Sequence, residues 1–209
     1  MAESSSAAAE SELGKRQRNT IRNREAILLA AREVFCETGY EAATVRDIIR
    51  RTTLASGTFY NYFPDKQTIL REIIEEFTIR LRHRVHEGRT RATTLEELLR
   101  YAYLATFQSY AEDETVVRLM ARNEGAIREL VMSLVLKPAV EELAADLRQK
   151  SREGIVPPVD IDYVARAGVA IAAEVGSGML EREQMDVDGA TEFATQLMLG
   201  GIERLTRSS

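Results

Sequence analysis

The chain has 209 residues, of which 44% are hydrophobic and 29% are charged, and its formal net charge is −5. This composition is typical of a water-soluble globular protein, and the length allows one large or two small domains. The sequence contains no apolar run long enough to span a membrane and no signal-peptide core. A single cysteine, Cys36, excludes an intramolecular disulfide and is expected to be a buried structural thiol. We therefore expect a cytoplasmic protein without membrane association.

The net charge is unevenly distributed along the chain. Residues 15–91 contain 16 Lys and Arg against 10 Asp and Glu, a balance of +6, whereas residues 1–14 carry −3 and residues 92–209 carry −8. A basic segment beside an acidic one is expected when only one part of a protein meets nucleic-acid phosphates. The overall acidity therefore does not exclude DNA binding.

Residues 1–18 are predicted to form a disordered tail with a basic end. The first 14 residues are mostly Ala, Ser and Glu, and Lys15, Arg16 and Arg18 follow them. Such an arm either reaches the backbone or minor groove of DNA or is a solvated leader, and both interpretations stay open.

The stretch 44–66 predicts two short helices joined by a tight turn. Thr44 and Asp47 have the spacing of a capping-box-like pair at the start of the first helix. The second helix, about residues 56–62, is anchored by apolar side chains and carries small hydroxyls and a phenol on its other side. A short helix of this kind suits the major groove of DNA.

The remaining pattern is helical throughout, with no strand pattern of weight. Apolar residues recur at three- and four-residue spacings in successive segments. Pro138 lies inside one of these segments and should kink or divide it. The predicted helices cover about residues 20–38, 66–87, 94–111, 114–122, 126–150, 160–182 and 188–206.

Two adjoining motifs carry a resemblance to a known family. Gly57-Thr58-Phe59-Tyr60, followed after two residues by Phe63-Pro64-Asp65-Lys66, resembles the DNA-binding signature of TetR-family regulators. The resemblance implies an all-α fold with a three-helix, helix-turn-helix DNA-binding domain at residues 19–66. A larger helical ligand-binding and dimerisation domain is then expected at residues 67–209.

The resemblance also implies a function and a set of DNA contacts. It implies a homodimeric regulator, most often a repressor, that binds double-stranded palindromic operator DNA and pairs its last two helices, in the region 160–206, with those of its partner. The two half-sites are expected about one helical turn, roughly 34–36 Å, apart or a multiple of it. By likeness, the backbone contacts are Thr44, Arg46, Thr58, Tyr60 and Lys66, whereas Ser56, Gly57 and Asn61 face the groove floor.

The turn between the two short helices departs from the family pattern. It reads Thr52-Thr53-Leu54-Ala55, where the family usually has Ala-Gly-Val-Ser. Thr53 replaces a glycine that relieves a left-handed backbone position, so strain is expected there. Ala55 replaces the serine that caps the second helix, so Ser56 or Thr53 must cap it or its end is frayed.

The second domain is expected to bind a hydrophobic small molecule between its helices. Aromatic and methionine side chains there line either a cavity or an ordinary core, and Glu174 pairs in the interface, contacts ligand or reaches solvent. Residues 118–130 and 141–147 are loosely similar to acyl-CoA-sensing repressors of fatty-acid metabolism, which makes acyl-CoA one candidate beside an unspecified hydrophobic effector. The predicted ligand-binding residues are Tyr103, Phe107, Tyr110, Met120, Arg122, Met132 and Glu174.

The sequence contains no catalytic motif. Its two histidines, His83 and His86, lie on a basic helix end, where a solvated face is favoured over a metal pair. We expect no enzyme activity, cofactor or metal. The alternative to a regulator is a helical carrier of hydrophobic ligands that has lost DNA binding, and operator binding would distinguish the two.

Overall fold

The computed structural model describes the backbone of residues 2–207, and the side chains within it except those of residues 2–13, 15, 124 and 126. All regular elements in this part of the chain are helices, which confirms the predicted all-α fold. The described helices include none long and apolar enough to cross a membrane. The chain divides into two compact units, residues 1–73 and residues 74–209.

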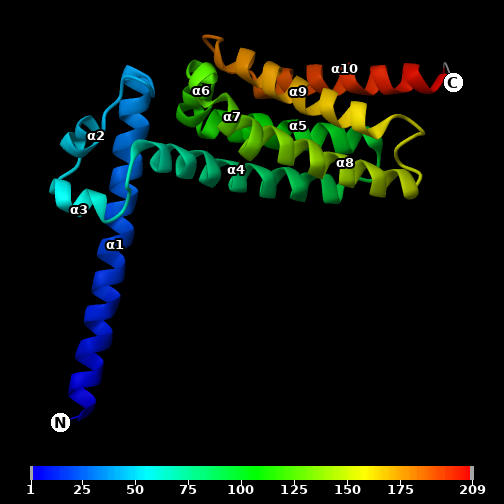
Figure 1. The fold of residues 1–209 in the computed structure, drawn as a ribbon. Helices are drawn as coiled ribbons and strands as arrows, with labels where there is room; N and C mark the ends of the chain where they lie inside the picture. Colours follow the sequence, from blue (N-terminus) through cyan, green and yellow to red (C-terminus); the bar gives the residue numbers. More distant parts are fainter. Residues whose placement is uncertain (1, 208–209) are drawn as a thin grey trace. The chain divides into compact units, whose positions relative to one another are not determined.

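The first unit contains α1 (Ala2–Thr38), α2 (Val45–Arg51), α3 (Ser56–Tyr60) and the start of α4 (Lys66–Arg91). Figure 1 shows α2 and α3 on the same flank of α1. The core consists of apolar side chains that the helical spacing predicts. Its fully buried members include Ile27, Ala31, Phe35, Ile48, Phe59, Phe63, Ile69 and Ile73.

Helix α1 is longer than the sequence predicts. Its backbone is helical from Ala2, so residues 2–18, expected to form a disordered tail, continue the helix. Alanine and glutamate have high helix propensities, which allow a helix end to extend without tertiary packing. Gly39 ends α1 with a φ of 82°, a left-handed conformation that glycine adopts without steric cost.

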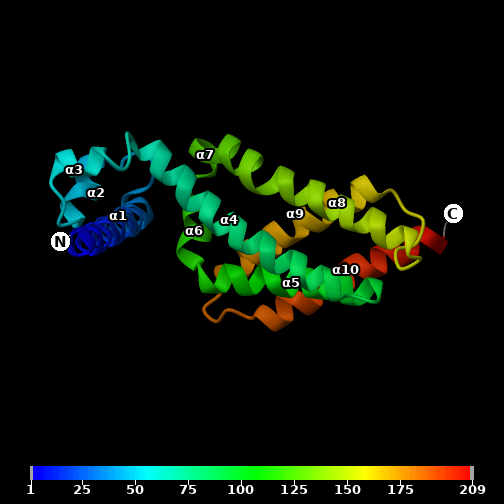
Figure 2. The ribbon, with the colours of Figure 1, turned by 90° about the horizontal axis from the view of Figure 1, so that it is seen from below.

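The second unit is built from long helices that run alongside one another. They are the end of α4, α5 (Leu95–Glu112), α8 (Lys137–Arg152), α9 (Ile161–Leu180) and α10 (Val187–Arg207) (Figure 2). The shorter helices α6 (Glu114–Arg122) and α7 (Glu124–Val131) follow α5 in the chain and lead toward α8. Helix α10 packs mainly on α5, and α8 packs on α9. The core of this unit includes Leu98, Phe107, Val116, Leu119, Ala165, Ala194 and Thr195.

Pro138 divides the segment that the sequence predicts as one helix with a kink or a break. A π-helical turn, η1 (Met132–Leu136), separates α7 from α8, and Pro138 lies in the first turn of α8. Proline has no N–H to donate to the preceding turn, so the hydrogen-bond register shifts before it. The register therefore changes just before Pro138, within the segment where the sequence predicts a kink or a division, and the backbone stays helical through it.

Gly176 is required by close packing of α9 against α5. A Cβ atom at this position would lie 2.6 Å from the ring of Tyr110, which is buried in the unit. Gly178, two residues further along the same helix, has no atom within 4 Å of its Cβ position. The two glycines therefore differ in packing although they share a helix.

We expect Gly176→Ala to destabilise the protein by about 1–3 kcal/mol, because the added methyl group displaces the Tyr110 ring. The matched control, Gly178→Ala, should be neutral or stabilise α9 by up to about 1 kcal/mol, since alanine favours a helix. Urea unfolding at a fixed protein concentration measures both. Equal effects of the two substitutions would contradict this packing.

Candidate DNA-binding and ligand-binding sites

Helix α2 begins with the capping box that the sequence predicts. The Thr44 hydroxyl oxygen accepts a hydrogen bond from the Asp47 N–H at 3.2 Å, and Oδ2 of Asp47 accepts from the N–H of Thr44 at 3.1 Å. The Thr44 hydroxyl also donates to Oδ2 of Asp47 at 2.6 Å. These bonds lower the pKa of the Asp47 carboxyl, so their contribution to stability is present above about pH 4 and is lost as the pH falls further.

The turn before α3 is unstrained, contrary to the expectation for Thr53. None of the described non-glycine residues has a positive φ, so Thr53 does not adopt the left-handed conformation. The Thr52 hydroxyl shapes the turn instead, donating to the carbonyl of Ile49 at 2.9 Å and accepting from the N–H of Leu54 at 3.2 Å. Ala55 is the N-cap of α3 and offers no side-chain cap, as predicted for an alanine at this position.

Helix α3 has a buried face and an exposed polar face. Phe59 is fully buried, whereas Tyr60 is 56% exposed. Ser56, Gly57 and Asn61 are also exposed, and Thr58 is half-buried. Phe59 therefore packs α3 against the rest of the unit, and the exposed face of the helix presents hydroxyl, phenol and amide groups.

Two of the residues predicted to contact the DNA backbone, Arg46 and Lys66, have different surroundings. Arg46 is exposed and forms no hydrogen bond or ion pair with the side chains that the structure describes. Lys66 instead points inward, and its Nζ donates to the carbonyls of Tyr40, Glu41 and Ala43 at 2.8, 2.9 and 2.9 Å. These three bonds use all the donors of an ammonium group.

Lys66 thus joins the start of α4 to the connection between α1 and α2. Its Nζ also lies 4.7 Å from the centre of the Tyr40 ring, a cation–π contact. With three internal acceptors the ammonium group has no donor left for DNA in this geometry, so we propose an internal role for Lys66 in place of the phosphate contact that the resemblance implies. The Thr44 hydroxyl is similarly used by the capping box.

The second unit contains an apolar cavity between α4, α5, η1, α8, α9 and α10. Its volume is about 90 Å³, well above the roughly 10–15 Å³ that admits one water molecule. Tyr103 and Tyr110 lie on its wall, as the sequence predicts for a ligand site, and burial raises the pKa of the Tyr110 phenol to about 12. Leucines and valines line much of the remainder, among them Leu81, Val85, Leu98, Leu99, Val135, Leu143 and Leu147.

The other predicted ligand residues do not line this cavity. Phe107 is fully buried but stacks behind the Tyr103 ring, with centroids 5.9 Å apart. Met132 is 47% exposed at the start of η1. Met120 is half-buried on α6, and Arg122 and Glu174 are exposed. Helical phase explains these differences, since aromatic or acidic type alone does not show which way a side chain faces.

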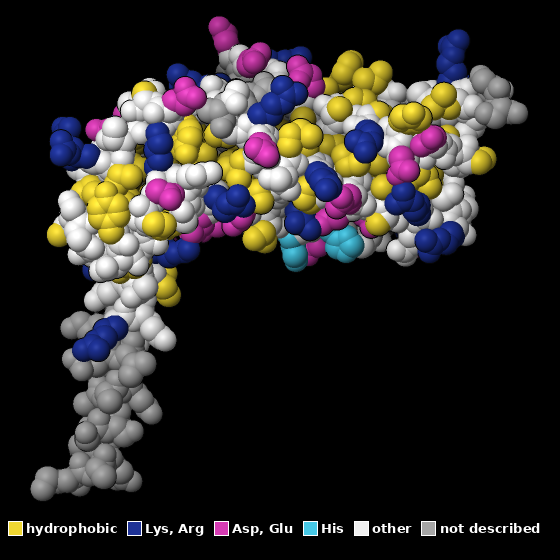
Figure 3. Space-filling model, in the orientation of Figure 1, with side chains coloured by type: hydrophobic (Ala, Val, Ile, Leu, Met, Phe, Trp, Pro, Cys, Tyr) yellow, Lys and Arg dark blue, Asp and Glu magenta, His cyan; other side chains and the backbone are white. Residues whose placement is uncertain are grey.

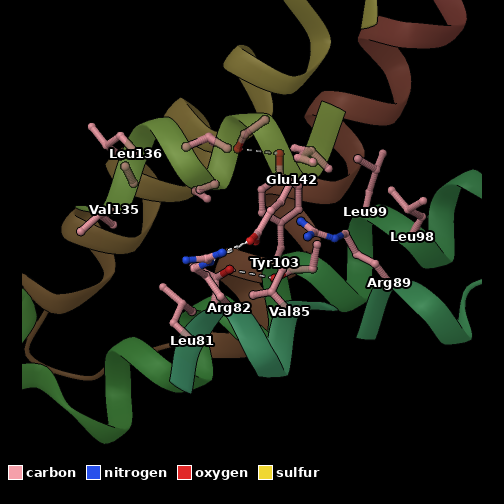
Figure 4. A pocket seen from close by; sticks show the side chains of 18 of the residues that line it. Leu81, Arg82, Val85, Arg89, Leu98, Leu99, Tyr103, Val135, Leu136 and Glu142 are labelled. Carbon is pink, nitrogen blue, oxygen red and sulfur yellow. Dashed lines mark hydrogen bonds and ion pairs between the residues drawn. The ribbon is translucent and has the colours of Figure 1, made fainter. Parts of the chain in front are cut away.

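Three charged residues on the cavity wall were not predicted from the sequence. Arg82 and Arg89 come from α4 and Glu142 from α8, and Figure 4 shows all three pointing into the same space. Nε of Arg82 donates to Oε1 of Glu142 at 2.8 Å. Arg89 is only 5% exposed. Its position four residues after Val85 and eight after Leu81, on the apolar stripe of α4, is the signal that could have identified it.

An all-helical chain with a helix-turn-helix unit and a second helical unit around an apolar cavity has the architecture of a DNA-binding transcriptional regulator. The family model for bacterial regulatory proteins of the TetR family matches residues 27–73. The transcriptional repressor KstR2 of Mycolicibacterium smegmatis is 30% identical over 189 residues, covering 86% of this chain and 92% of that protein. The chain belongs to the TetR family, which confirms the resemblance inferred from its motifs.

Two FadR structures are among the solved structures that share the fold. The fatty acid degradation regulator FadR from Bacillus halodurans superposes with a TM-score of 0.74 at 25% identity, covering 85% of this chain and 95% of that one. FadR from Bacillus subtilis, solved in complex with stearoyl-CoA, gives a TM-score of 0.73 at 22% identity, covering 85% and 98%. KstR2 and the two FadR proteins are regulators, which fits the expectation that the chain is not an enzyme.

We expect Lys66→Gln to destabilise the protein by about 1.5–3 kcal/mol, because three backbone carbonyls lose a charged donor. Arg50→Gln is the control, since Arg50 is an exposed cation on α2. Its free energy of unfolding should change by less than about 0.5 kcal/mol. Urea unfolding at one protein concentration compares the two, and a Lys66 variant as stable as the control would contradict the internal role.

Proposed function

We propose that the protein is a homodimeric repressor that binds a palindromic operator through α3 and is released by a hydrophobic small molecule. The observation that carries the DNA-binding part is the division of α3 into a buried aromatic face and an exposed polar face. Similarity to the repressor KstR2 along most of the chain supports repression as the mode of action.

Base recognition is assigned to the exposed residues of α3. Ser56, Gly57 and Asn61 face the groove floor, where hydroxyl and amide groups pair with base edges. Thr58 and Tyr60 contact the DNA backbone from the same helix. Arg46 supplies the cationic phosphate contact, because its guanidinium is exposed. Thr44 and Lys66 orient these residues from within the unit.

The dimer is proposed to form through α9 and α10. Helix α10 carries an exposed stripe at four-residue spacing: Phe193 at 60% exposure, Leu197 at 51%, Gly201, and Leu205 at 59%. A contiguous apolar stripe on one helix face is unfavourable in water and is typical of a contact surface. The glycine lets a second helix approach closely, since no atom lies within 4 Å of its Cβ position.

We expect Leu197→Arg to convert the dimer into a monomer, because an unpaired charge in the middle of the stripe opposes burial. Gln196→Arg, an exposed neighbour on another face of α10, should leave the dimer intact. Sedimentation equilibrium distinguishes a particle of 23.5 kDa from one of twice that mass. A wild-type monomer, or a dimer in both variants, would contradict this interface.

The ligand is proposed to enter the apolar cavity of the second unit. A cavity of about 90 Å³ is smaller than the 300–1,000 Å³ of small-molecule sites, so a ligand must widen it by moving the helices that form its wall. Helix α4 is one of them, and the same helix begins in the DNA-binding unit. Binding would therefore favour a dimer whose two α3 helices no longer match the operator.

Acyl-CoA is the ligand class with the most support. One structural relative is a fatty acid degradation regulator, and another was solved with stearoyl-CoA. The apolar lining of the cavity suits an acyl chain.

We expect the protein to shift the DNA upstream of its own gene in a gel, with affinity that falls as salt rises. An Asn61→Ala variant should lose about 1–3 kcal/mol of preference for that DNA over an unrelated fragment. Acyl-CoA should abolish the shift. Absence of binding to this and to other promoter fragments would favour the alternative of a ligand carrier without DNA binding.

A further inference from the structure

Two hollows meet at one ion pair in the second unit. The apolar cavity described above lies inside the helices, and an open groove of about 550 Å³ lies on the surface along α4 and α8. Arg82 and Glu142 line both. His83 and His86 also line the groove, and Figure 3 shows histidine side chains on the surface. The Arg82–Glu142 pair is therefore the wall between the cavity and the groove.

Arg89 is a buried cation on the cavity wall, and its Nε faces Asp146. Its Nε lies 2.7 Å from Oδ2 of Asp146, but neither atom makes a well-aligned hydrogen bond. Its other two nitrogens, Nη1 and Nη2, carry four of the guanidinium's five donors on a side chain that lines the cavity. A buried donor without an acceptor is costly, and a guanidinium carries five donors in a planar fork. The cavity thus contains donors that a ligand can satisfy.

The surrounding charges favour an uncharged acceptor over a second anion. Arg82 is paired with Glu142, and Arg89 with Asp146, so the four side chains are balanced. Burial lowers the pKa of Arg89, whereas the negative charges of Asp146 and Glu142 oppose that shift. A ligand carboxylate beside Arg89 would face these two carboxylates in a medium of low polarity. A carbonyl oxygen accepts the same hydrogen bonds without that repulsion.

We propose that Arg89 binds the carbonyl oxygen of an esterified acyl chain, a thioester or an ester, and discriminates against the free fatty acid. The chain would lie among the leucines of the cavity, and the group attached to the carbonyl would reach the groove past the Arg82–Glu142 pair that separates the two hollows. This inference rests on the proposed function, because it names the ligand class and orientation of the same site.

The groove gives the attached group both room and contacts. It is open to solvent, and it offers Arg82, His83 and His86 beside Glu142 and Asp146. A large polar headgroup would be tolerated there, whereas a cavity of about 90 Å³ could not enclose one. The acyl end is therefore the part that enters, and the polar end stays outside.

Calorimetric titration with three soluble probes of equal chain length tests the proposal. They are octanoyl-N-acetylcysteamine, an uncharged thioester, octanoyl-CoA, with a large headgroup, and octanoate. Wild-type protein should bind both thioesters at least about 10-fold more tightly than octanoate. Octanoate binding as tightly as the thioesters would overturn the inference and leave the hydrophobic-ligand function standing. Binding of the small thioester but not of octanoyl-CoA would overturn the proposed exit into the groove.

The double variant Arg89→Met with Asp146→Asn removes the donors and leaves no unpaired buried charge. It should bind octanoyl-N-acetylcysteamine about 10- to 100-fold more weakly and lose its preference over octanoate. Arg91→Met, an exposed arginine on the same helix, is the control and should bind like wild type. Unchanged thioester affinity in a folded double variant would overturn the role of Arg89.

The proposal can also be tested if the double variant does not fold. If circular dichroism shows the double variant unfolded, Arg89→Lys replaces it, since lysine keeps a charge near Asp146 but loses the planar fork. The ranking of the three probes on wild type needs no variant. Failure of all three to bind wild type would overturn the hydrophobic-ligand function together with this inference, while operator binding, measured separately without ligand, would still stand.

Discussion

The ammonium group of Lys66 determines the geometry of the DNA-binding unit. Lys66 lies in the first turn of α4, and its Nζ donates hydrogen bonds to the carbonyls of Tyr40, Glu41 and Ala43. Those carbonyls lie between α1 and α2, so the contact fixes where α2 begins. The capping box at Thr44 then sets the direction of α2, and buried Phe59 anchors α3. The exposed face of α3 is thus oriented by interactions that do not involve DNA.

Much of this unit could be predicted from the sequence because its signals are local. The Thr44–Asp47 pair and the alternation of apolar and polar residues define α2 and α3 without tertiary information. Lys66 could not be placed in this way, since an ammonium group serves a phosphate or a carbonyl equally well and the carbonyls lie over 20 residues away in sequence. The expectation of strain at Thr53 was wrong for a related reason. The hydroxyl of Thr52 supplies a local hydrogen bond that a family pattern does not reveal.

In the second unit, helix boundaries were easier to predict than cavity residues. Pro138 predicted a division of the long segment because the missing N–H acts locally. The cavity depends on which face each helix turns inward, and only Tyr103 and Tyr110 of the seven predicted ligand residues line it. Arg89 followed the apolar periodicity of α4, but its charge favoured the interpretation of a solvated helix end. A charged residue at an apolar position of the pattern is a signal for a buried functional group.

The salt dependence of operator affinity tests most directly whether Lys66 supports the structure or contacts DNA. The logarithm of the affinity falls linearly with the logarithm of the salt concentration, with a slope of about −0.9 for each neutralised phosphate. For Lys66→Gln, we expect an unchanged slope on the operator, with any loss of affinity equal at all salt concentrations. For Arg46→Gln, the slope should become shallower by about one. A shallower slope for Lys66→Gln, equal to that of the Arg46 variant, would contradict the account.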